Sequence, residues 1–198
     1  MRLLIATTNV GKLREYRSLF AGLECELLGL ADAGIIDDVD EAGQTYEENA
    51  ILKARSYAAH SDLLTLADDS GLEVDALQGR PGVHSARYAP DSPARIRKLL
   101  AELKDVPDNQ RSARFQCVIV LAHPDGRLDI TTGTCEGQIA RAARGSHGFG
   151  FDPVFYLAGQ NATLAELPED FKNQHSHRAR AAQKMRPILE RILAEESR

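Results

Sequence analysis

The chain of 198 residues is 43% hydrophobic and 27% charged, a balance typical of a globular domain with one substantial core. Its formal net charge of −5 argues against the basic surface that wraps duplex nucleic acid, and no apolar run approaches the length of a membrane span. We therefore predict a single domain over residues 1–198 that stays in the cytoplasm and has no nucleic-acid or membrane partner. The three cysteines, Cys25, Cys117 and Cys135, lack metal-ligand spacing, which predicts reduced thiols.

The first half of the chain alternates between strand-like and helix-like patterns. Strands are predicted over 3–7, 25–30 and 64–67, and helices over 13–21, 46–61 and 92–103. Thr45 and Glu48 stand three residues apart before an apolar-periodic run, which is the pattern of a capping box. Ser92 and Pro93 are suited to cap the third helix.

The second half predicts a hairpin and a C-terminal helix. Long strands are expected over 115–123 and 127–139, joined by the turn Pro124-Asp125-Gly126. A glycine-rich loop follows over 146–153, and an amphipathic helix is expected from Ser176 onward, in which Pro187 should bend the helix or cost it a hydrogen bond. Alternating helices and strands followed by a hairpin predict an α/β fold whose mixed sheet has helices on both faces.

Two adjacent carboxylates, Asp68 and Asp69, end the apolar run Leu64–Ala67. Successive side chains of a strand point to opposite faces, so we expect the following Ser70-Gly71 to form a turn that lets both aspartates share one site. Such a site, with help from an acidic loop, suits Mg²⁺, and a carboxylate there could equally act as a base for water. The alternative is a turn in which both aspartates cap local N–H groups.

Charge is unevenly distributed along the chain. Seven acids and no Lys or Arg lie between 32 and 48, namely Asp32, Asp37, Asp38, Asp40, Glu41, Glu47 and Glu48. Five bases and no acid lie between 171 and 189, namely Lys172, Arg178, Arg180, Lys184 and Arg186. Either run alone is consistent with a solvated face, whereas the two together suit a metal bound beside an anionic substrate.

The segment TTNVGK joins a buried strand to a helix. Backbone N–H groups at such a helix start favour anions, and Lys12 adds a point charge for phosphate oxygens. The alternative is an ordinary strand–helix corner with an exposed lysine. The longer Walker pattern is absent.

Two further segments carry chemistry-bearing side chains. In SHGFGFDPVF, Phe149 and Phe151 could lie flat on a planar ring while Asp152 accepts hydrogen bonds from its edge, or the two rings could simply pin the loop to the core. In FKNQHSHRAR, His177 and Arg178 fall in the first turn of the last helix. Cations are unfavourable there, so either an anionic or accepting group compensates them or they lie on the surface.

The segments TTNVGK, ADDSGLEVDAL, GRPGVHSARYA, GFGFDPVF and SHR together resemble the Ham1/RdgB family, pyrophosphatases of inosine and other non-standard purine nucleoside triphosphates. The resemblance covers essentially the whole chain. It implies an elongated mixed β-sheet flanked by helices, two lobes with a deep substrate cleft, and a homodimer. The implied reaction is Mg²⁺-dependent hydrolysis of ITP, dITP or XTP to the monophosphate and pyrophosphate.

The same resemblance implies a role for particular residues. Asp69 would accept a proton and bind the metal, helped by Asp40 or Glu41, although the residues alone do not decide between Asp68 and Asp69 as the base. Residues that would bind substrate are Thr7, Thr8, Asn9, Val10, Gly11, Lys12, Ser70, Phe149, Gly150, Phe151, Asp152, Lys172, His177 and Arg178. Thr8 stands where many members have glycine, a departure close to the expected phosphate site.

Three other functions were weighed against this one. A phosphomonoesterase with an aspartate nucleophile needs two aspartates separated by one residue, a spacing that ADDSG lacks. Maf-type pyrophosphatases fit the motifs less well. A nucleotide sensor without turnover would gain little from extra carboxylates near phosphates.

Overall fold

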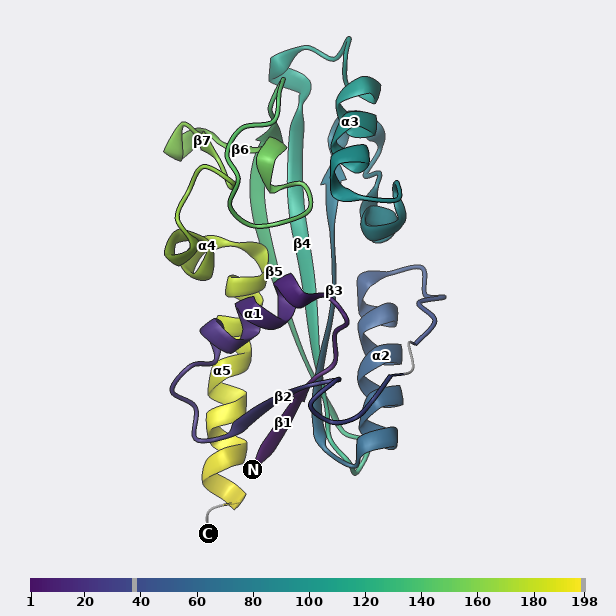
Figure 1. Cartoon of the computed structure of the whole chain (residues 1–198), viewed down its shortest axis with the longest axis vertical. Coiled ribbons are helices and arrows are strands. Elements are labelled where there is room, and N and C mark those ends of the chain that lie inside the picture. The colour runs from purple at the N-terminus through teal and green to yellow at the C-terminus, as the bar shows by residue number, and fades with distance from the viewer. Residues whose placement is uncertain (37–38, 197–198) are drawn as a thin grey trace. The chain divides into compact units, whose positions relative to one another are not determined.

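The computed structural model describes residues 1–36 and 39–196, so Asp37 and Asp38 of the acidic run lie outside the described residues. Its strands are β1 (Arg2–Ile5), β2 (Glu26–Gly29), β3 (Leu64–Val74), β4 (Ser112–Ala122), β5 (Leu128–Ile139), β6 (Phe155–Leu157) and β7 (Ala162–Thr163). Its α-helices are α1 (Val10–Leu19), α2 (Tyr46–Ser61), α3 (Ser92–Glu102), α4 (Glu169–His175) and α5 (His177–Glu196) (Figure 1).

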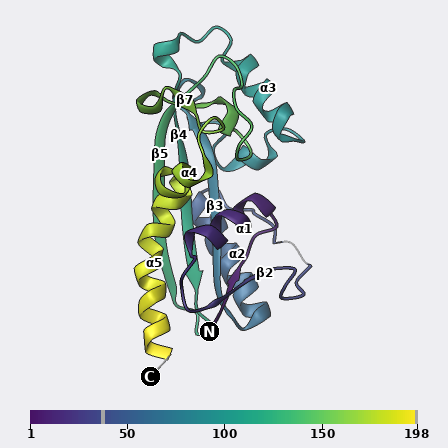
Figure 2. The same cartoon turned by 60° about the vertical axis from the view of Figure 1, so that its left-hand side comes forward.

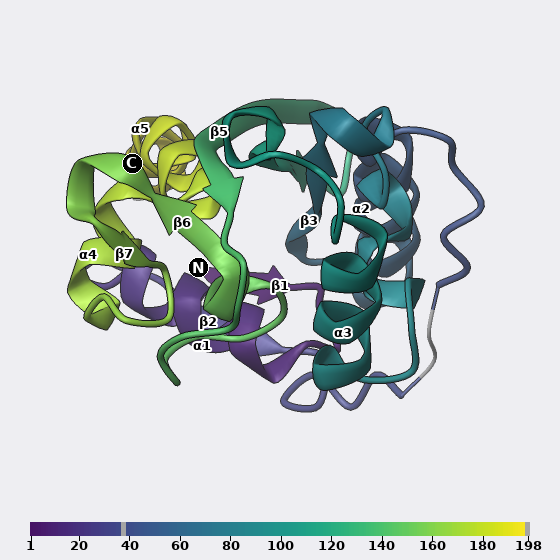
Figure 3. The same cartoon turned by 90° about the horizontal axis from the view of Figure 1, so that it is seen from above.

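The strands form one mixed sheet in the order β2-β1-β3-β4-β5-β6-β7, which confirms the predicted α/β fold class. Strand β1 pairs in parallel with both β2 and β3, with Leu4 opposite Leu28 and Thr65. At the other end, β6 pairs antiparallel with β5 and β7, and Figure 3 shows these three strands side by side. The strands β6 and β7 and the helix α4 were not predicted, because strands of three and two residues and a helix of seven residues carry too few positions for a periodic pattern.

The chain divides into two compact units. Unit 1 comprises Met1–Asp69, Cys117–Gly133 and Arg178–Arg198, and unit 2 comprises Ser70–Gln116 and Thr134–His177. Strand β3 contributes to both, since the boundary falls between Asp69 and Ser70.

In unit 1 the alternation of side chains along each strand builds two apolar layers, one on each face of the sheet. Leu3, Ile5, Leu64 and Leu66 pack with residues of α1 and α5, such as Met185. The intervening strand residues form a second cluster with α2, whose members include Leu4, Ala6, Ala67, Ala50 and Ala54. Figures 1 and 2 accordingly show α5 and α2 on opposite sides of the strands of this unit.

Helix starts in unit 1 follow from local capping. The predicted capping box of α2 is confirmed, since Glu48 N donates to Thr45 Oγ1 at 3.1 Å and Thr45 N donates to Glu48 Oε2 at 3.2 Å. Helix α1 begins at Val10, earlier than predicted, because the Asn9 side chain accepts from Gly11 N at 2.9 Å and from Lys12 N at 3.2 Å. The residues from Val10 to Lys12 therefore belong to the first helical turn.

The course of strand β3 differs from the prediction at the two aspartates of the candidate site. The predicted turn at Ser70-Gly71 is wrong, because β3 runs without interruption from Leu64 to Val74. The buried side chains of Leu72 and Val74 draw this extension into the core of unit 2, and Leu72 N donates to Ser85 Oγ at 2.8 Å. Local turn propensity is thus outweighed by apolar residues beyond the glycine.

Unit 2 has its own core, formed by apolar residues of β3, α3, β4, β5 and β6 that include Leu72, Leu99, Phe115, Ile139 and Phe155. The predicted cap of α3 at Ser92 is wrong, because the helix already begins at Ser92 and its cap is Asp91, which accepts from Ala94 N at 2.7 Å. The predicted β4–β5 hairpin is also confirmed, with Gly126 in the turn at φ +88°.

Helix α5 is fastened to its neighbours in unit 1 by polar contacts. Thr131 Oγ1 donates to Ala181 O at 3.0 Å. Arg186 Nη2 donates to two carbonyl groups at the end of α1, Leu19 O at 2.9 Å and Ala21 O at 2.8 Å. Pro187 lies inside α5, as predicted. Among the described residues, no helix combines the length and apolarity needed to cross a membrane.

Candidate active site

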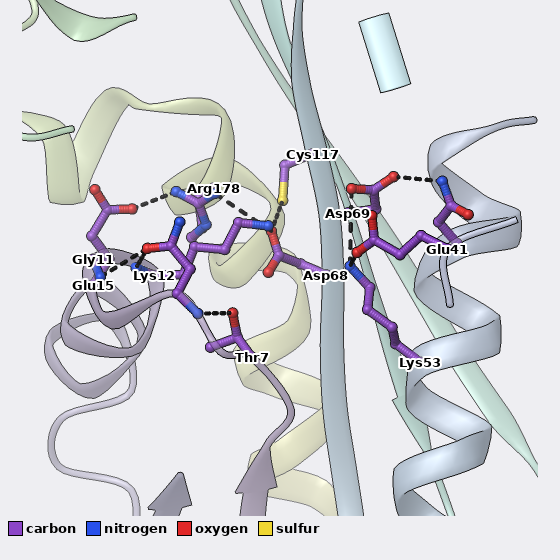
Figure 4. A network of polar contacts seen from close by, with 12 residues as sticks. Thr7, Gly11, Lys12, Glu15, Glu41, Lys53, Asp68, Asp69, Cys117 and Arg178 are labelled. Carbon is purple, nitrogen blue, oxygen red and sulfur yellow. Dashed lines mark hydrogen bonds and ion pairs between the residues drawn. The ribbon is translucent and has the colours of Figure 1, made fainter. Parts of the chain in front are cut away.

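Asp68 and Asp69 lie on opposite faces of β3, because the strand does not turn between them (Figure 4). Asp68 continues the Leu64–Leu66 side and faces α1 and α5, and Asp69 continues the Thr65–Ala67 side and faces α2. The expectation that both aspartates share one site through a turn is therefore wrong. Each has a separate set of partners.

The carboxylate of Asp68 is held by two cations and a thiol. Lys12 Nζ lies 2.9 Å and Arg178 Nη2 3.4 Å from Asp68 Oδ2, and Cys117 Sγ lies 3.7 Å from the same oxygen. The Asp68 side chain is 1% exposed and that of Lys12 14% exposed. Lys12 is thus neither a free surface cation nor paired with Asp69, and the prediction of an ordinary corner with an exposed lysine does not describe it.

Glu15 completes this network, and sequence reasoning missed it. Its Oε2 accepts from Arg178 Nη1, and both side chains are buried. The group Glu15, Arg178, Asp68 and Lys12 therefore contains two anions and two cations, so that charge is balanced within a largely buried network. One signal could have found Glu15: it precedes Tyr16, a core residue of α1, in the helix that TTNVGK opens.

The surrounding charges determine how Asp68 titrates. Burial alone would raise the pKa of its carboxyl group, but the cations, led by Lys12 and Arg178, outweigh burial and hold the pKa well below the ordinary value. Burial next to this anion raises the pKa of the Cys117 thiol to about 12. Asp68 is therefore a permanent anion at neutral pH and a weak base.

Asp69 has a different environment on the α2 face. Asn49 Nδ2 donates to its Oδ2 at 3.1 Å, and Lys53 Nζ lies 3.9 Å from its Oδ1. Lys53 Nζ also lies 2.6 Å from Glu41 Oε1, so the ammonium group stands between the two carboxylates. Burial raises the pKa of Asp69 and outweighs the opposing effect of Lys53, Lys12 and Asn49.

Helix α2 positions both of these partners. Asn49 and Lys53 are separated by one helical turn on the buried side of α2, beside Ala50 and Ala54. Asn49 Oδ1 also accepts from Gly43 N at 2.8 Å, and a Cβ on Gly43 would meet that oxygen at 2.6 Å, so only glycine fits. Sequence reasoning missed Asn49 and Lys53, although polar residues four apart within an apolar helix face are a recognisable signal.

The surroundings of Lys53 distinguish Glu41 from Asp40, the two acids proposed to help Asp69 bind the metal. Glu41 reaches Lys53 beside Asp69, whereas Asp40 is exposed. No group of three or more His, Cys, Asp or Glu side chains suited to a metal ion occurs among residues 1–36 and 39–196. Two carboxylates already converge on a cation here, however, and Mg²⁺ commonly takes only one or two protein carboxylates together with phosphate oxygens. The donor set therefore fits Mg²⁺ in the presence of a polyphosphate.

The start of α1 offers the predicted anion-favouring helix end. Asn9 N donates to Thr7 Oγ1 at 3.2 Å, which, with the Asn9 cap, fixes the turn that precedes the helix. Thr8 and Asn9 are exposed, and Val10 is 80% exposed. No acidic residue lies in the first turn, so nothing there opposes an anion.

Unit 2 contains a second constellation of predicted residues. Asp152 Oδ2 accepts from Lys172 Nζ at 2.7 Å and from Phe149 N at 2.9 Å, and both charged side chains are 6% exposed. Lys172 Nζ also lies 5.2 Å from the centre of the Phe149 ring. Gly148 has φ +77°, and a Cβ there would lie 2.0 Å from Asp152 Oδ2, so the loop can close over the ion pair only with glycine.

The two phenylalanines of this loop differ in position. Phe151 is 4% exposed and belongs to the core of unit 2, so the alternative that it pins the loop holds for this ring. Phe149 is only partly buried and remains a candidate stacking surface. His177, the first residue of α5, is buried and stacks on Phe115 with ring centres 4.7 Å apart. Together with the buried Arg178, this shows that neither cation of the helix start lies on the surface.

The predicted site residues thus fall into two groups. Unit 1 contains Thr7, Thr8, Asn9, Val10, Gly11, Lys12, Asp40, Glu41, Asp69 and Arg178. Unit 2 contains Ser70, Phe149, Gly150, Phe151, Asp152, Lys172 and His177.

Comparison with known proteins agrees with these motifs. The family model of the Ham1 family matches residues 3–188. A dITP/XTP pyrophosphatase of Geobacillus kaustophilus is 49% identical over 199 residues, which cover 99% of this chain and 98% of that protein.

Solved structures agree as well. A HAM1 protein from Coxiella burnetii has a TM-score of 0.87 at 40% identity, covering 96% of this chain and 99% of that one. A nucleoside-triphosphatase / dITP/XTP pyrophosphatase from Mycobacterium abscessus has a TM-score of 0.74 at 42% identity, covering 94% and 100%. The match of sequence and fold over nearly the whole length shows that this chain belongs to the Ham1 family.

Proposed function

We propose that this protein hydrolyses the triphosphates of inosine and xanthosine, in the ribo or deoxy form, to the nucleoside monophosphate and pyrophosphate. The observation that carries the proposal is the environment of Asp69: a buried carboxylate with a raised pKa, placed by β3 and α2 beside Glu41 and a cation. A base of raised pKa accepts a proton from water more readily near neutral pH than an ordinary carboxylate does.

Asp69 is accordingly the proposed base and Asp68 is not. One oxygen of Asp68, Oδ2, is held by Lys12 and Arg178, and the lowered pKa of this carboxyl group makes it a poor proton acceptor. Its role is instead to hold these two cations in place. Asp69 would orient the attacking water and accept its proton.

Asp69 and Glu41 are the residues that would hold Mg²⁺, together with phosphate oxygens of the substrate. When bound, the ion would neutralise charge on the phosphates during attack at the α-phosphorus. The segment from Thr7 to Lys12 would bind the triphosphate through the start of α1, where backbone N–H groups favour an anion.

Discrimination between bases is assigned to unit 2. Hypoxanthine and xanthine carry an N1–H donor beside an O6 acceptor, whereas adenine presents the reverse. The buried pair Asp152 and Lys172 offers an acceptor and a donor side by side, with Phe149 as a stacking surface. The edge of adenine would match neither the carboxylate nor the ammonium group of this ion pair, and a site built on such bonds can discriminate by about 10⁴ or more.

The test is a panel of ITP, dITP, XTP, ATP and GTP, with pyrophosphate and orthophosphate measured separately. Pyrophosphate release from the first three, stopped by a chelator and restored by Mg²⁺, is the expected result. Orthophosphate as the first product would instead indicate a phosphatase, and binding without turnover would indicate a sensor. The homodimer is a separate prediction, which light scattering tests.

A further inference from the structure

The ammonium group of Lys53 occupies the space between the two carboxylates that the proposed function assigns to a divalent ion. Its Nζ lies 2.6 Å from Glu41 Oε1 and 3.9 Å from Asp69 Oδ1. The contact with Glu41 is a short, charge-assisted hydrogen bond. Both carboxylates therefore already face a cation within the protein itself.

Burial makes this arrangement stronger than a surface ion pair. The Lys53 side chain is 11% exposed and that of Asp69 8% exposed, so solvent screens their charges poorly. A lysine ammonium group that faces two carboxylates keeps its charge at neutral pH, so Lys53 acts as a full cation here.

The protein by itself offers a divalent ion little else. No cluster of three or more ligating side chains is present in the part of the chain that the structure describes. An ion entering between Glu41 and Asp69 would have to approach an ammonium group of like charge or move it aside. Phosphate oxygens of a bound nucleotide change this balance, because they add ligands for the ion and a new anionic partner for the displaced ammonium.

We propose that Lys53 holds the cation position between Glu41 and Asp69 in the substrate-free protein, so that a divalent ion binds there only by displacing the Lys53 ammonium group. This inference rests on the proposed function, which assigns the two carboxylates to the metal. It follows that the ion enters together with the triphosphate and binds weakly without it.

Binding of Mn²⁺ to the nucleotide-free protein, followed by electron paramagnetic resonance, tests this directly. The variant Lys53→Met removes the competing charge and is expected to bind Mn²⁺ at least about tenfold more tightly than the unsubstituted protein, which corresponds to about 1.4 kcal/mol. Lys53→Arg keeps the charge and is expected to bind as weakly as the unsubstituted protein. If Lys53→Met does not fold, as judged by circular dichroism, Lys53→Gln replaces it, because its amide can still donate to Glu41.

A matched control separates this local effect from a change in net charge. Lys172 also forms a buried ion pair, with its Nζ 2.7 Å from Asp152 Oδ2, and lies in unit 2. Lys172→Met changes the net charge by the same amount and is expected to leave Mn²⁺ affinity unchanged.

Equal tightening in Lys53→Met and Lys172→Met would overturn the inference, as would unchanged or weaker Mn²⁺ binding by folded Lys53→Met. The measurement uses no nucleotide, so its failure is distinct from failure of the proposed function. In one outcome the unsubstituted protein releases no pyrophosphate from ITP while the Lys53→Met variant binds Mn²⁺ tightly. That result would refute the proposed reaction and support the role of Lys53.

Discussion

Substitution of the two adjacent aspartates by asparagine should affect stability unequally, with Asp68→Asn lowering it far more than Asp69→Asn. Asp68→Asn removes one partner of a buried network and leaves Lys12 and Arg178 without their shared anion. Breaking a buried ion pair in this way costs about 3–5 kcal/mol. For a chain of this length, about 2–4 °C of melting temperature is lost per kcal/mol, so the midpoint should fall by about 6–20 °C.

Asp69→Asn should behave differently. Burial raises the pKa of Asp69, which means that the folded protein disfavours its charge, and asparagine removes that charge. The hydrogen bond from Asn49 can be kept by the new amide oxygen, so stability should change by no more than about 1.5 kcal/mol. Turnover of ITP should nevertheless be abolished, because the proposed base is gone.

Thermal unfolding followed by circular dichroism, with pyrophosphate release measured well below each midpoint, distinguishes the two variants. The pH dependence supplies a further check. The pKa of Asp68 is lowered in the folded protein, so its stabilisation is complete above the unfolded-state pKa of about 3.9 and is lost as pH falls through the folded-state pKa. The stability gap between Asp68→Asn and the unsubstituted protein should therefore be full at pH 7 and narrow only below about pH 4.

The reasoning fails if both variants are destabilised equally, because the two carboxylates would then share one environment. It also fails if Asp69→Asn keeps near-normal turnover, since Asp69 would not be the base. Loss of turnover in both variants at unequal stability agrees with a base at one position and a residue that positions cations at the other.

Three further predictions concern other parts of the chain. Gly148→Ala should lower kcat/KM for ITP and should lower the free energy of unfolding by about 1–3 kcal/mol more than Gly150→Ala does. Both glycines have positive φ, but a Cβ meets Asp152 only at position 148. Equal losses of stability in the two variants would contradict the clash. Because the pKa of Cys117 is raised to about 12, only a fraction of about 10⁻⁴ of this thiol should be ionised at pH 8. Mass spectrometry should therefore show that Cys117 resists alkylation in the native protein and reacts fully in urea. Thr45→Ala should cost about 1 kcal/mol in urea unfolding through loss of the α2 cap and leave kcat for ITP unchanged.

Sequence patterns predicted the long elements and their order well. The capping box of α2, the β4–β5 hairpin and the alternation of β1 all follow from local spacing, and local spacing is retained in the fold. Turn propensity at Ser70-Gly71 misled because it is a weak local preference. The apolar residues that follow, such as Leu72, gain more by continuing the strand into the core of unit 2.

The site was predictable in its motifs but not in its pairings. TTNVGK and ADDSG were recognised, yet the partner of Lys12 turned out to be Asp68, because side-chain direction in β3 depends on whether the strand continues. Glu15 is distant in sequence from its partner Arg178, and Lys53 is distant from Glu41 and Asp69. Only tertiary packing of α1 and α2 on the sheet identifies these residues as members of the network.

Helix α5 holds α1 at two separate points. Arg178 contacts Glu15 within α1, and Arg186, two turns further along α5, binds the carbonyl groups of Leu19 and Ala21 at its end. A chain that ends before Arg186 would keep every residue proposed to take part in the reaction. It would still lose one of the two polar contacts by which α5 holds α1, the helix that begins after Asn9. C-terminal truncation should therefore leave α1 less firmly positioned.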